Sequence, residues 1–240
     1  MPWLPALAVG VACAAALLAT VAGLGSRFGV WQFRTGFTLL GYAVYGGTGA
    51  VLLGIAGGIM AARRRRGAGV VLALLAMAGG LAVAAVPVSW RLHARQVPAI
   101  HDITTDTVNP PQFVALLPLR RDAPNPAVYG GPAVAGEQKR AYPDLRTEVL
   151  DLPADRAFER ALAAARAMGW RIVSADPAAN RIEASDTTFW FGFVDDVVIR
   201  VAPAGERTLL DIRSVSRVGK SDVGTNATRI RSYLHRLRSS

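Results

Sequence analysis

Acidic and imidazole side chains gather in the stretch "IHDITTD", where His101, Asp102 and Asp106 fall within six residues. A second pair of carboxylates, Asp195 and Asp196, opens a later apolar run. If the fold brings these five side chains together, they could perform acid/base hydrolysis or bind a hard metal ion. The opposing interpretation is turn chemistry, because Asp and Thr in such stretches commonly hydrogen-bond the nearby backbone. We favour turn chemistry and predict no metal and no cofactor, and we keep a metal-dependent or acid/base hydrolase of the cell envelope as the alternative function.

Other catalytic signatures are weaker. The segment "GKSDVG" places glycines near Ser221 but does not match G-x-S-x-G, the motif of a serine hydrolase nucleophile. The sequence contains neither a phosphate-binding P-loop nor a dinucleotide fingerprint. The single cysteine, Cys13, lies in an apolar run, so the charged part of the chain has no disulfide and no thiol nucleophile. The sequence therefore predicts no catalytic residue.

Basic and hydroxyl side chains concentrate near the C-terminus. Residues 213–240 carry seven basic residues and one acid, whereas residues 91–212 carry 14 basic and 16 acidic residues. An anionic ligand or lipid headgroups could be bound by Arg213, Ser214, Ser216, Arg217, Lys220 and Ser221. Alternatively, these arginines form ion pairs with internal carboxylates, and Asp222 repels an anion from the start of the last helix. Both interpretations stay open on the sequence alone.

The elements that must position these residues follow from hydrophobic periodicity. The run "PADRAFERALAAARAMGW" predicts a helix that Gly169 ends. Four runs then alternate with period two and predict strands: "RIVSA", "RIEASDTTFWFGF", "DDVVIRV" and "TLLDIRSVS". A last helix is expected to begin after Ser221 as its N-cap, with Asp222 in its first position. The predicted fold over residues 98–240 is an α+β domain, an antiparallel sheet of about four strands with two helices on one face.

Two parts of this domain have less regular patterns. Residues 98–150 contain many helix and strand breakers and predict irregular chain that wraps around the domain. In the second strand run, the alternation places Phe189, Phe191 and Phe193 on the buried face.

Residues 1–92 form a predicted membrane region that contains no acidic residue. Three uncharged apolar runs, about residues 3–25, 37–62 and 68–90, are long enough to be transmembrane helices. Small residues recur every fourth position from Gly46 to Ala62 and mark a face for close packing, either inside the bundle or against another subunit. The spans contain no ionisable Asp, Glu, Lys, Arg or His, which favours a helical anchor over a transporter.

Basic residues in the short loops predict the orientation. The run "RRRRG" joins the second and third spans and marks the cytoplasmic side. The N-terminus is therefore predicted to be cytoplasmic, and everything after Trp90 is predicted to lie in the periplasm, outside the inner membrane. Nucleic acid is excluded as a partner by this export, although the formal net charge is +10.

Five motifs carry a resemblance to a known family. They are, in order, "IHDITTDTVNPPQF", "YPDL", "GW", "RIEASDTTFWFGFVDDVVIRV" and "DIRSVSRVGKSDVGTNATRI". Residues 99–237 resemble the bacterial domain-of-unknown-function family 1499, whose members with membrane spans ahead of the domain agree with the hydropathy pattern. The resemblance implies no activity and no catalytic residue.

We conclude from the sequence that this is an inner-membrane protein with a periplasmic α+β domain. The favoured function is a non-enzymatic binding or interaction module, with the Arg-rich strand–helix junction as its contact surface. The expected partners are membrane lipids, and other envelope proteins are a further candidate.

Overall fold

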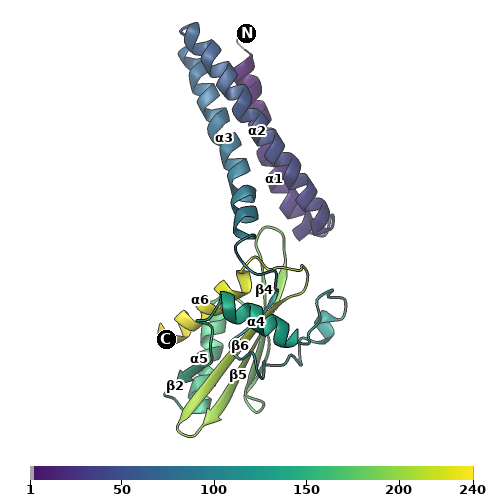
Figure 1. Cartoon of the computed structure of the whole chain (residues 1–240), viewed down its shortest axis with the longest axis vertical. Helices are drawn as coiled ribbons and strands as arrows, with labels where there is room; N and C mark the ends of the chain where they lie inside the picture. The colour runs from purple at the N-terminus through teal and green to yellow at the C-terminus, as the bar shows by residue number, and fades with distance from the viewer. Residues whose placement is uncertain (1–2, 240) are drawn as a thin grey trace. The chain divides into compact units, whose positions relative to one another are not determined.

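A computed structural model describes residues 3–239 of the chain, which divides into two compact units (Figure 1). The first unit contains the residues up to His93 together with Phe189–Gly192, and the second contains the residues from Ala94 to Thr188 and from Phe193 onward. Each unit buries apolar side chains of its own.

The first unit is a bundle of three helices, α1 (Leu4–Arg27), α2 (Phe33–Arg63) and α3 (Gly67–His93). Each helix is long and apolar enough to cross a membrane. The three predicted spans are therefore confirmed as helices, which extend a few residues beyond most of the predicted ends. The chain remains helical through Pro87 of α3. Proline has no backbone N–H to donate, and a long apolar helix can accommodate the loss of this one hydrogen bond.

The small residues of α2 pack inside this bundle. A Cβ atom added to Gly46 would lie 3.1 Å from the Cβ atom of Ala15 in α1, and one added to Gly58 would lie 3.2 Å from that of Ala73 in α3. Ala50, between them, is fully buried. Such close approach depends on side chains no larger than alanine. Of the two alternatives left by the sequence, packing within the bundle is the one observed.

The second unit is built on one six-stranded sheet in which every pairing is antiparallel. Its strands are β1 (Asp102–Thr104), β2 (Glu148–Leu150), β3 (Arg171–Asp176), β4 (Arg181–Thr187), β5 (Val194–Ala204) and β6 (Arg207–Ser216). The spatial order is β1-β6-β5-β4-β3, and β2 pairs with a second stretch of β6. The α+β class is confirmed, with two short strands more than the sequence predicted.

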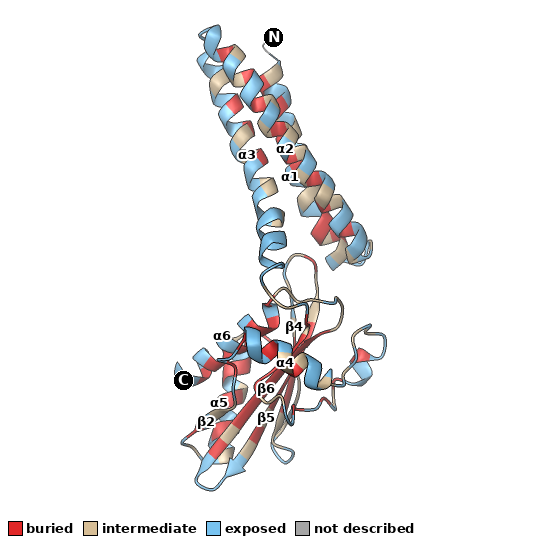
Figure 2. Ribbon diagram, in the orientation of Figure 1, coloured by how far each residue is buried: buried red, intermediate tan, exposed pale blue. Residues whose placement is uncertain are grey.

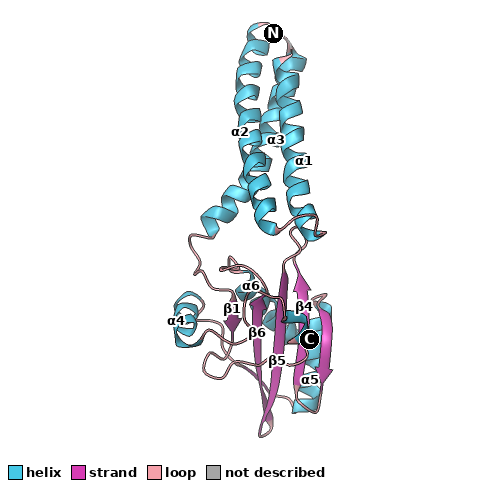
Figure 3. Cartoon of the chain, turned by 90° about the vertical axis from the view of Figure 1, so that its right-hand side faces the viewer, coloured by secondary structure: helices cyan, strands magenta, loops and turns pink. Residues whose placement is uncertain are grey.

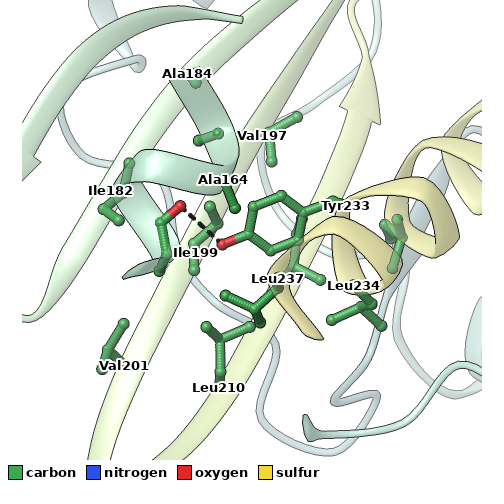
Figure 4. Packing of buried hydrophobic residues seen from close by; sticks show 14 of the residues in the cluster. Ala164, Ile182, Ala184, Val197, Ile199, Val201, Leu210, Tyr233, Leu234 and Leu237 are labelled. Carbon is green, nitrogen blue, oxygen red and sulfur yellow. Dashed lines mark hydrogen bonds between the residues drawn. The ribbon is translucent and has the colours of Figure 1, made fainter. Parts of the chain in front are cut away.

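Two helices, α5 (Ala154–Ala167) and α6 (Thr225–Ser239), cover one face of this sheet (Figure 3). Figure 2 shows the buried residues running along the central strands and the inner sides of both helices. Tyr233 of α6 is at the centre of this core, where its ring stacks on Trp170 at 5.3 Å between centroids. Its hydroxyl donates to the backbone oxygen of Ala161 at 3.1 Å (Figure 4). Burial of apolar area on this face supplies most of the stability of the fold.

The stretch predicted as irregular contains more structure than expected. Besides β1 and β2 it forms a 3₁₀ turn (Pro118–Arg120) and the helix α4 (Gly131–Ala141). Gln138 of α4 caps the open edge of β1, because its amide nitrogen donates to the backbone oxygen of Thr104 at 2.6 Å and its oxygen accepts from the Thr104 amide at 3.0 Å. Three-residue strands have no periodicity of their own, so only their pairing with β6 reveals them.

The prediction that "TTFWFGF" continues the second strand run, with its phenylalanines on the buried face, is wrong. Strand β4 ends at Thr187 and β5 begins at Val194, and a tight loop joins them. The amide of Thr188 donates to the oxygen of Phe193 at 2.8 Å, and Gly192 takes the left-handed conformation with φ +70°. Phe189 is 83% exposed, and Phe191 is buried in the first unit, 4.9 Å from the ring of Phe37. Alternation alone does not separate a strand from a loop that alternates by chance.

Candidate functional site

Buried charges line the face of the sheet that points away from α5 and α6. Five arginines and five acidic residues form ion pairs there, so their formal charges cancel. The pairs are Arg120–Asp196, Arg217–Asp196, Arg213–Asp102, Arg181–Glu183, Arg200–Asp106 and Arg200–Asp211. We call this set the charged layer. It fixes the segment that follows β1 to the sheet.

Arg213 occupies the middle of the charged layer and its side chain is completely buried. Its Nε and Nη2 atoms donate to the two carboxylate oxygens of Asp102 at 2.9 and 2.7 Å. The remaining donors reach the backbone oxygens of Pro111 at 3.2 Å and Ala127 at 2.8 Å. The guanidinium also lies 5.3 Å from the ring centre of Phe113, a favourable cation–π geometry. All three nitrogen atoms of the guanidinium therefore donate inside the protein.

Asp196 receives two guanidinium groups. Arg217 binds it through Nε at 2.8 Å and Nη2 at 2.9 Å, and Nη1 of Arg120 approaches at 2.7 Å. The hydroxyl of Ser185 donates to the same carboxylate at 2.7 Å. Nε of Arg120 is buried without a hydrogen-bond partner. Each oxygen of this carboxylate therefore accepts two hydrogen bonds.

Asp106 belongs to a third group, in which Arg200 bridges it to Asp211 at 2.9 and 2.8 Å. Burial alone would raise the pKa of Asp106, but hydrogen bonds from the amides of Asn109 and Val108 and the charge of Arg200 outweigh burial and lower it. The arrangement is an Asp-turn that an arginine ties to the sheet, as the turn interpretation predicts.

A separate polar network lies on the helix-covered face. Arg229 of α6 donates to Asp195 at 2.6 Å and to the side-chain oxygen of Asn226 at 2.6 Å. The hydroxyl of Ser214 donates to the same oxygen at 2.6 Å, and the amide of Asn226 donates to Ser216 at 3.0 Å. Because side chains alternate along β5, Asp195 and Asp196 point to opposite faces of the sheet.

The junction before α6 differs from the prediction. The hydroxyl of Ser221 accepts from the amide of Val223 at 3.1 Å, as expected, but the helix begins only at Thr225. Val223 and Gly224 have φ values of +54° and +78°, so they cannot belong to a right-handed helix. Asp222 caps the helix instead, since its carboxylate accepts from the amides of Gly224 and Asn226, each at 2.8 Å. Burial raises the pKa of Asp222, and these hydrogen bonds oppose the effect.

The six residues of the predicted ligand site therefore have different environments. Arg213, Ser214 and Ser216 are buried and bonded internally, and the side chain of Arg217 is only 20% exposed and paired. Lys220 is the member with an exposed side chain. The helix N-terminus that was predicted to attract an anion already holds the carboxylate of Asp222. The ligand-binding hypothesis stays a prediction, now without a cluster of free arginines at this junction.

The five residues of the alternative acid/base site do not converge. Asp102 and Asp196 flank Val215 from its two sides, two strand spacings or about 10 Å apart. Asp195 faces the other layer, and Nδ1 of His101 lies 3.3 Å from the backbone oxygen of Lys220. Within residues 3–239, no group of three or more His, Cys, Asp and Glu side chains is placed to hold a metal ion.

A surface hollow on α6 is the feature that the sequence analysis missed. It has a volume of about 570 Å³ and is lined by Met168, Arg231, Ser232, His235, Arg236 and Ser239. Arg231 is paired with Asp144 at 2.6 and 2.8 Å, which orients its guanidinium at the rim. The lining side chains follow the polar side of the helix, opposite the buried stripe of Ala227, Ile230, Leu234 and Leu237. The spacing of the apolar residues along α6 indicates that this side of the helix is polar, but a sequence pattern cannot show that the surface there is concave.

The comparisons with known proteins agree with the motif-based resemblance. A family model described as "Protein of unknown function (DUF1499)" matches residues 102–237, which is more than half of the chain. The match covers the sheet, both covering helices and the charged layer. A search of curated proteins found no match.

Proposed function

The chain belongs to the DUF1499 family, and we propose that it acts as a membrane-anchored binding module that recognises a phosphate-bearing anionic component of the cell envelope. In this proposal the three helices anchor the chain in the inner membrane of a bacterium. The second unit functions on the periplasmic side, and the outer side of α6 is its contact surface.

The orientation is supported by the distribution of arginine. Four arginines, Arg63–Arg66, lie at the connection between α2 and α3, whereas the connection between α1 and α2 has only Arg27 and Arg34. Basic turns are retained on the cytoplasmic side during insertion. With three spans, a cytoplasmic α2–α3 turn places the chain after α3 on the opposite side.

The contact surface is supported by one observation, the hollow on α6. Arg236 and His235 provide donors, and the hydroxyls of Ser232 and Ser239 provide more. Arg231 and Arg236 both line the hollow, so two guanidinium groups stand at one concave surface. Guanidinium groups match phosphate geometry particularly well.

The pairing of the carboxylates favours binding over hydrolysis. A general base must be able to accept a proton near neutral pH. A carboxylate whose oxygens already accept from a guanidinium group is not placed to take a proton from a substrate. Asp102, Asp106, Asp195 and Asp196 are each bonded in this way.

The proposal is tested by following a side chain that lines the hollow, His235. The full-length protein, labelled with ¹³C in its three histidines, is titrated in detergent with inorganic pyrophosphate, and the ring signals are followed by NMR. The His235 signal is identified by its loss in His235→Gln. We expect pyrophosphate to shift this signal saturably in the wild type. In Arg236→Glu the signal should not shift, because charge reversal repels the probe.

The matched control is Arg121→Glu, which makes the same charge change at an exposed position that does not line the hollow. It should leave the titration unchanged. A His235 signal that does not respond to pyrophosphate, or that responds equally in Arg236→Glu, would contradict the proposed surface.

A further inference from the structure

The turn between α2 and α3 has a defined backbone geometry. The amide of Arg66 donates to the oxygen of Ala61 at 2.9 Å, and the amide of Arg65 donates to that of Ala62 at 2.9 Å. These two bonds, with Arg65 at φ +52°, form a Schellman motif that ends α2. An arginine occupies the left-handed position where glycine is usual. Helix α3 then begins at once, at Gly67.

This turn lies beside a hollow at the end of the bundle, with a volume of about 420 Å³. Of the four consecutive arginines, Arg64 and Arg66 line it, whereas Arg63 and Arg65 do not. The opposite wall is apolar and comes from all three helices, with Pro5 of α1, Met60 of α2 and Leu72 of α3. The hollow therefore combines a cationic rim with a hydrophobic wall.

The charges of this rim have no counter-ion within the bundle. The sequence contains no aspartate or glutamate before Asp102. Among the ion pairs of the described residues, none involves Arg63, Arg64, Arg65 or Arg66. This contrasts with the second unit, where most of the buried guanidinium groups have a carboxylate. The neutralising anion must come from outside the chain.

We infer that this hollow binds one anionic phospholipid, with the phosphodiester at Arg64 and Arg66 and the glycerol and upper acyl chain along the apolar wall. Two guanidinium groups can bind phosphate oxygens in paired hydrogen bonds. The amides of Gly67 and Ala68, at the start of α3, have no partner within the helix and point toward the same turn, whereas those of Gly69 and Val70 donate to the oxygen of Arg66. An apolar wall would not assist a free inorganic ion, but it suits a ligand whose charged group continues into hydrocarbon. The inference concerns the first unit and does not depend on the proposed contact surface on α6.

The experiment counts bound lipid on the full-length protein. The protein is extracted in a neutral detergent, mixed with equal amounts of phosphatidylglycerol and phosphatidylcholine, and analysed by native mass spectrometry. We expect one phosphatidylglycerol to be retained in preference to phosphatidylcholine. The double variant Arg64→Gln/Arg66→Gln should weaken this binding about 30-fold, the effect expected for two arginines that contact an anionic headgroup.

The chain provides a closely matched control, Arg63→Gln/Arg65→Gln. It removes the same charge from the same turn, with the same effect on insertion, but spares the arginines that line the hollow. This variant should retain the lipid, because a neutral detergent micelle has no anionic surface that could attract the arginines outside the hollow. Ala68→Phe tests the cavity in a different way, since it fills the hollow without changing the charge and should also release the lipid.

Three results would overturn the inference. The first is equal retention of phosphatidylglycerol and phosphatidylcholine. The second is an equal loss in the two double variants, which would indicate a general effect of charge. The third is displacement of the lipid by millimolar inorganic phosphate, which would show that the site selects a free anion.

Discussion

Arg213 has the largest volume among the fully buried side chains of the described residues, although arginine is rarely found inside a protein. It is stable there because Asp102 neutralises it and two backbone oxygens take its remaining donors. Transferring such a pair from water has a high desolvation cost, so its net contribution to stability is small while both partners are present. Removing one partner leaves the other charge buried and unpaired.

The substitution Arg213→Met should therefore lower the free energy of unfolding by about 3 to 5 kcal/mol. Urea denaturation of the full-length protein in detergent, followed by near-ultraviolet circular dichroism, measures this change. The control Arg207→Met breaks an ion pair whose side chains are 66% and 82% exposed, and should change the free energy of unfolding by less than about 1 kcal/mol. If both variants lose the same small amount, Asp102 does not depend on Arg213.

Asp106 gives the charged layer a defined pH dependence. Its folded-state pKa lies below the ordinary value of 3.8, because amide hydrogen bonds and Arg200 outweigh the effect of burial. A lowered folded-state pKa adds stability that is complete above the unfolded-state pKa and is lost as the pH falls through the folded-state value. The free energy of unfolding should therefore be higher in the wild type than in Asp106→Asn near neutral pH. This difference should shrink below about pH 4, and a difference that grows on acidification would refute the assignment.

At the scale of elements, Glu183 links β4 to the turn that covers it. Its carboxylate accepts from the amides of Val114, Ala115 and Leu116 at 2.9 to 3.1 Å, and Nε of Arg181 approaches at 3.1 Å. One carboxylate thus satisfies three consecutive backbone donors that have no strand or helix partner. This explains how a segment with little regular structure stays fixed on the sheet.

Glu183→Gln should loosen this turn while the sheet stays folded. The neutral amide keeps one acceptor and loses the charge-assisted bonds, each worth about 1.5 to 3 kcal/mol. Hydrogen exchange at Val114, Ala115 and Leu116 should become faster by about tenfold or more. Glu206→Gln, at an exposed turn between β5 and β6, should leave these rates unchanged. Unchanged exchange in Glu183→Gln would mean that Phe113 and Leu116 hold the segment by packing alone.

At the scale of the whole molecule, the membrane topology determines to which cellular compartment, and so to which ligands, the second unit is exposed. A reporter enzyme that is active only outside the cytoplasm, fused after Trp90, should be active if the proposed orientation is right. The same reporter fused after Arg66 should be inactive, because the proposed orientation keeps the arginine turn in the cytoplasm. Activity of a cytoplasm-only reporter after Trp90 would reverse the assignment and remove the envelope as the source of the ligand.

Local patterns were sufficient for the long elements. The helices α1, α2 and α3 follow from the length of their uncharged apolar runs, and α5, β3, β5 and β6 follow from hydrophobic periodicity. The elements β1, β2 and α4 escaped detection, because a three-residue strand or a polar helix is stabilised by distant partners. The loop 188–193 was misassigned for the related reason that its alternating phenylalanines imitate a strand.

The sequence by itself determined that this chain has three apolar segments long enough to span a membrane, an α+β domain of a recognisable family and a basic C-terminal region. Hydropathy and motif order are local properties, and they do not depend on which residues meet. Only the tertiary structure decided the role of each charge. It paired Arg213 and Arg217 with carboxylates more than 20 positions away in the chain, sent Asp195 and Asp196 to opposite faces, and left two hollows lined by arginine. Whether a charge is neutralised or free depends on distances of a few ångströms, which pairing across strands sets and residue order does not reveal.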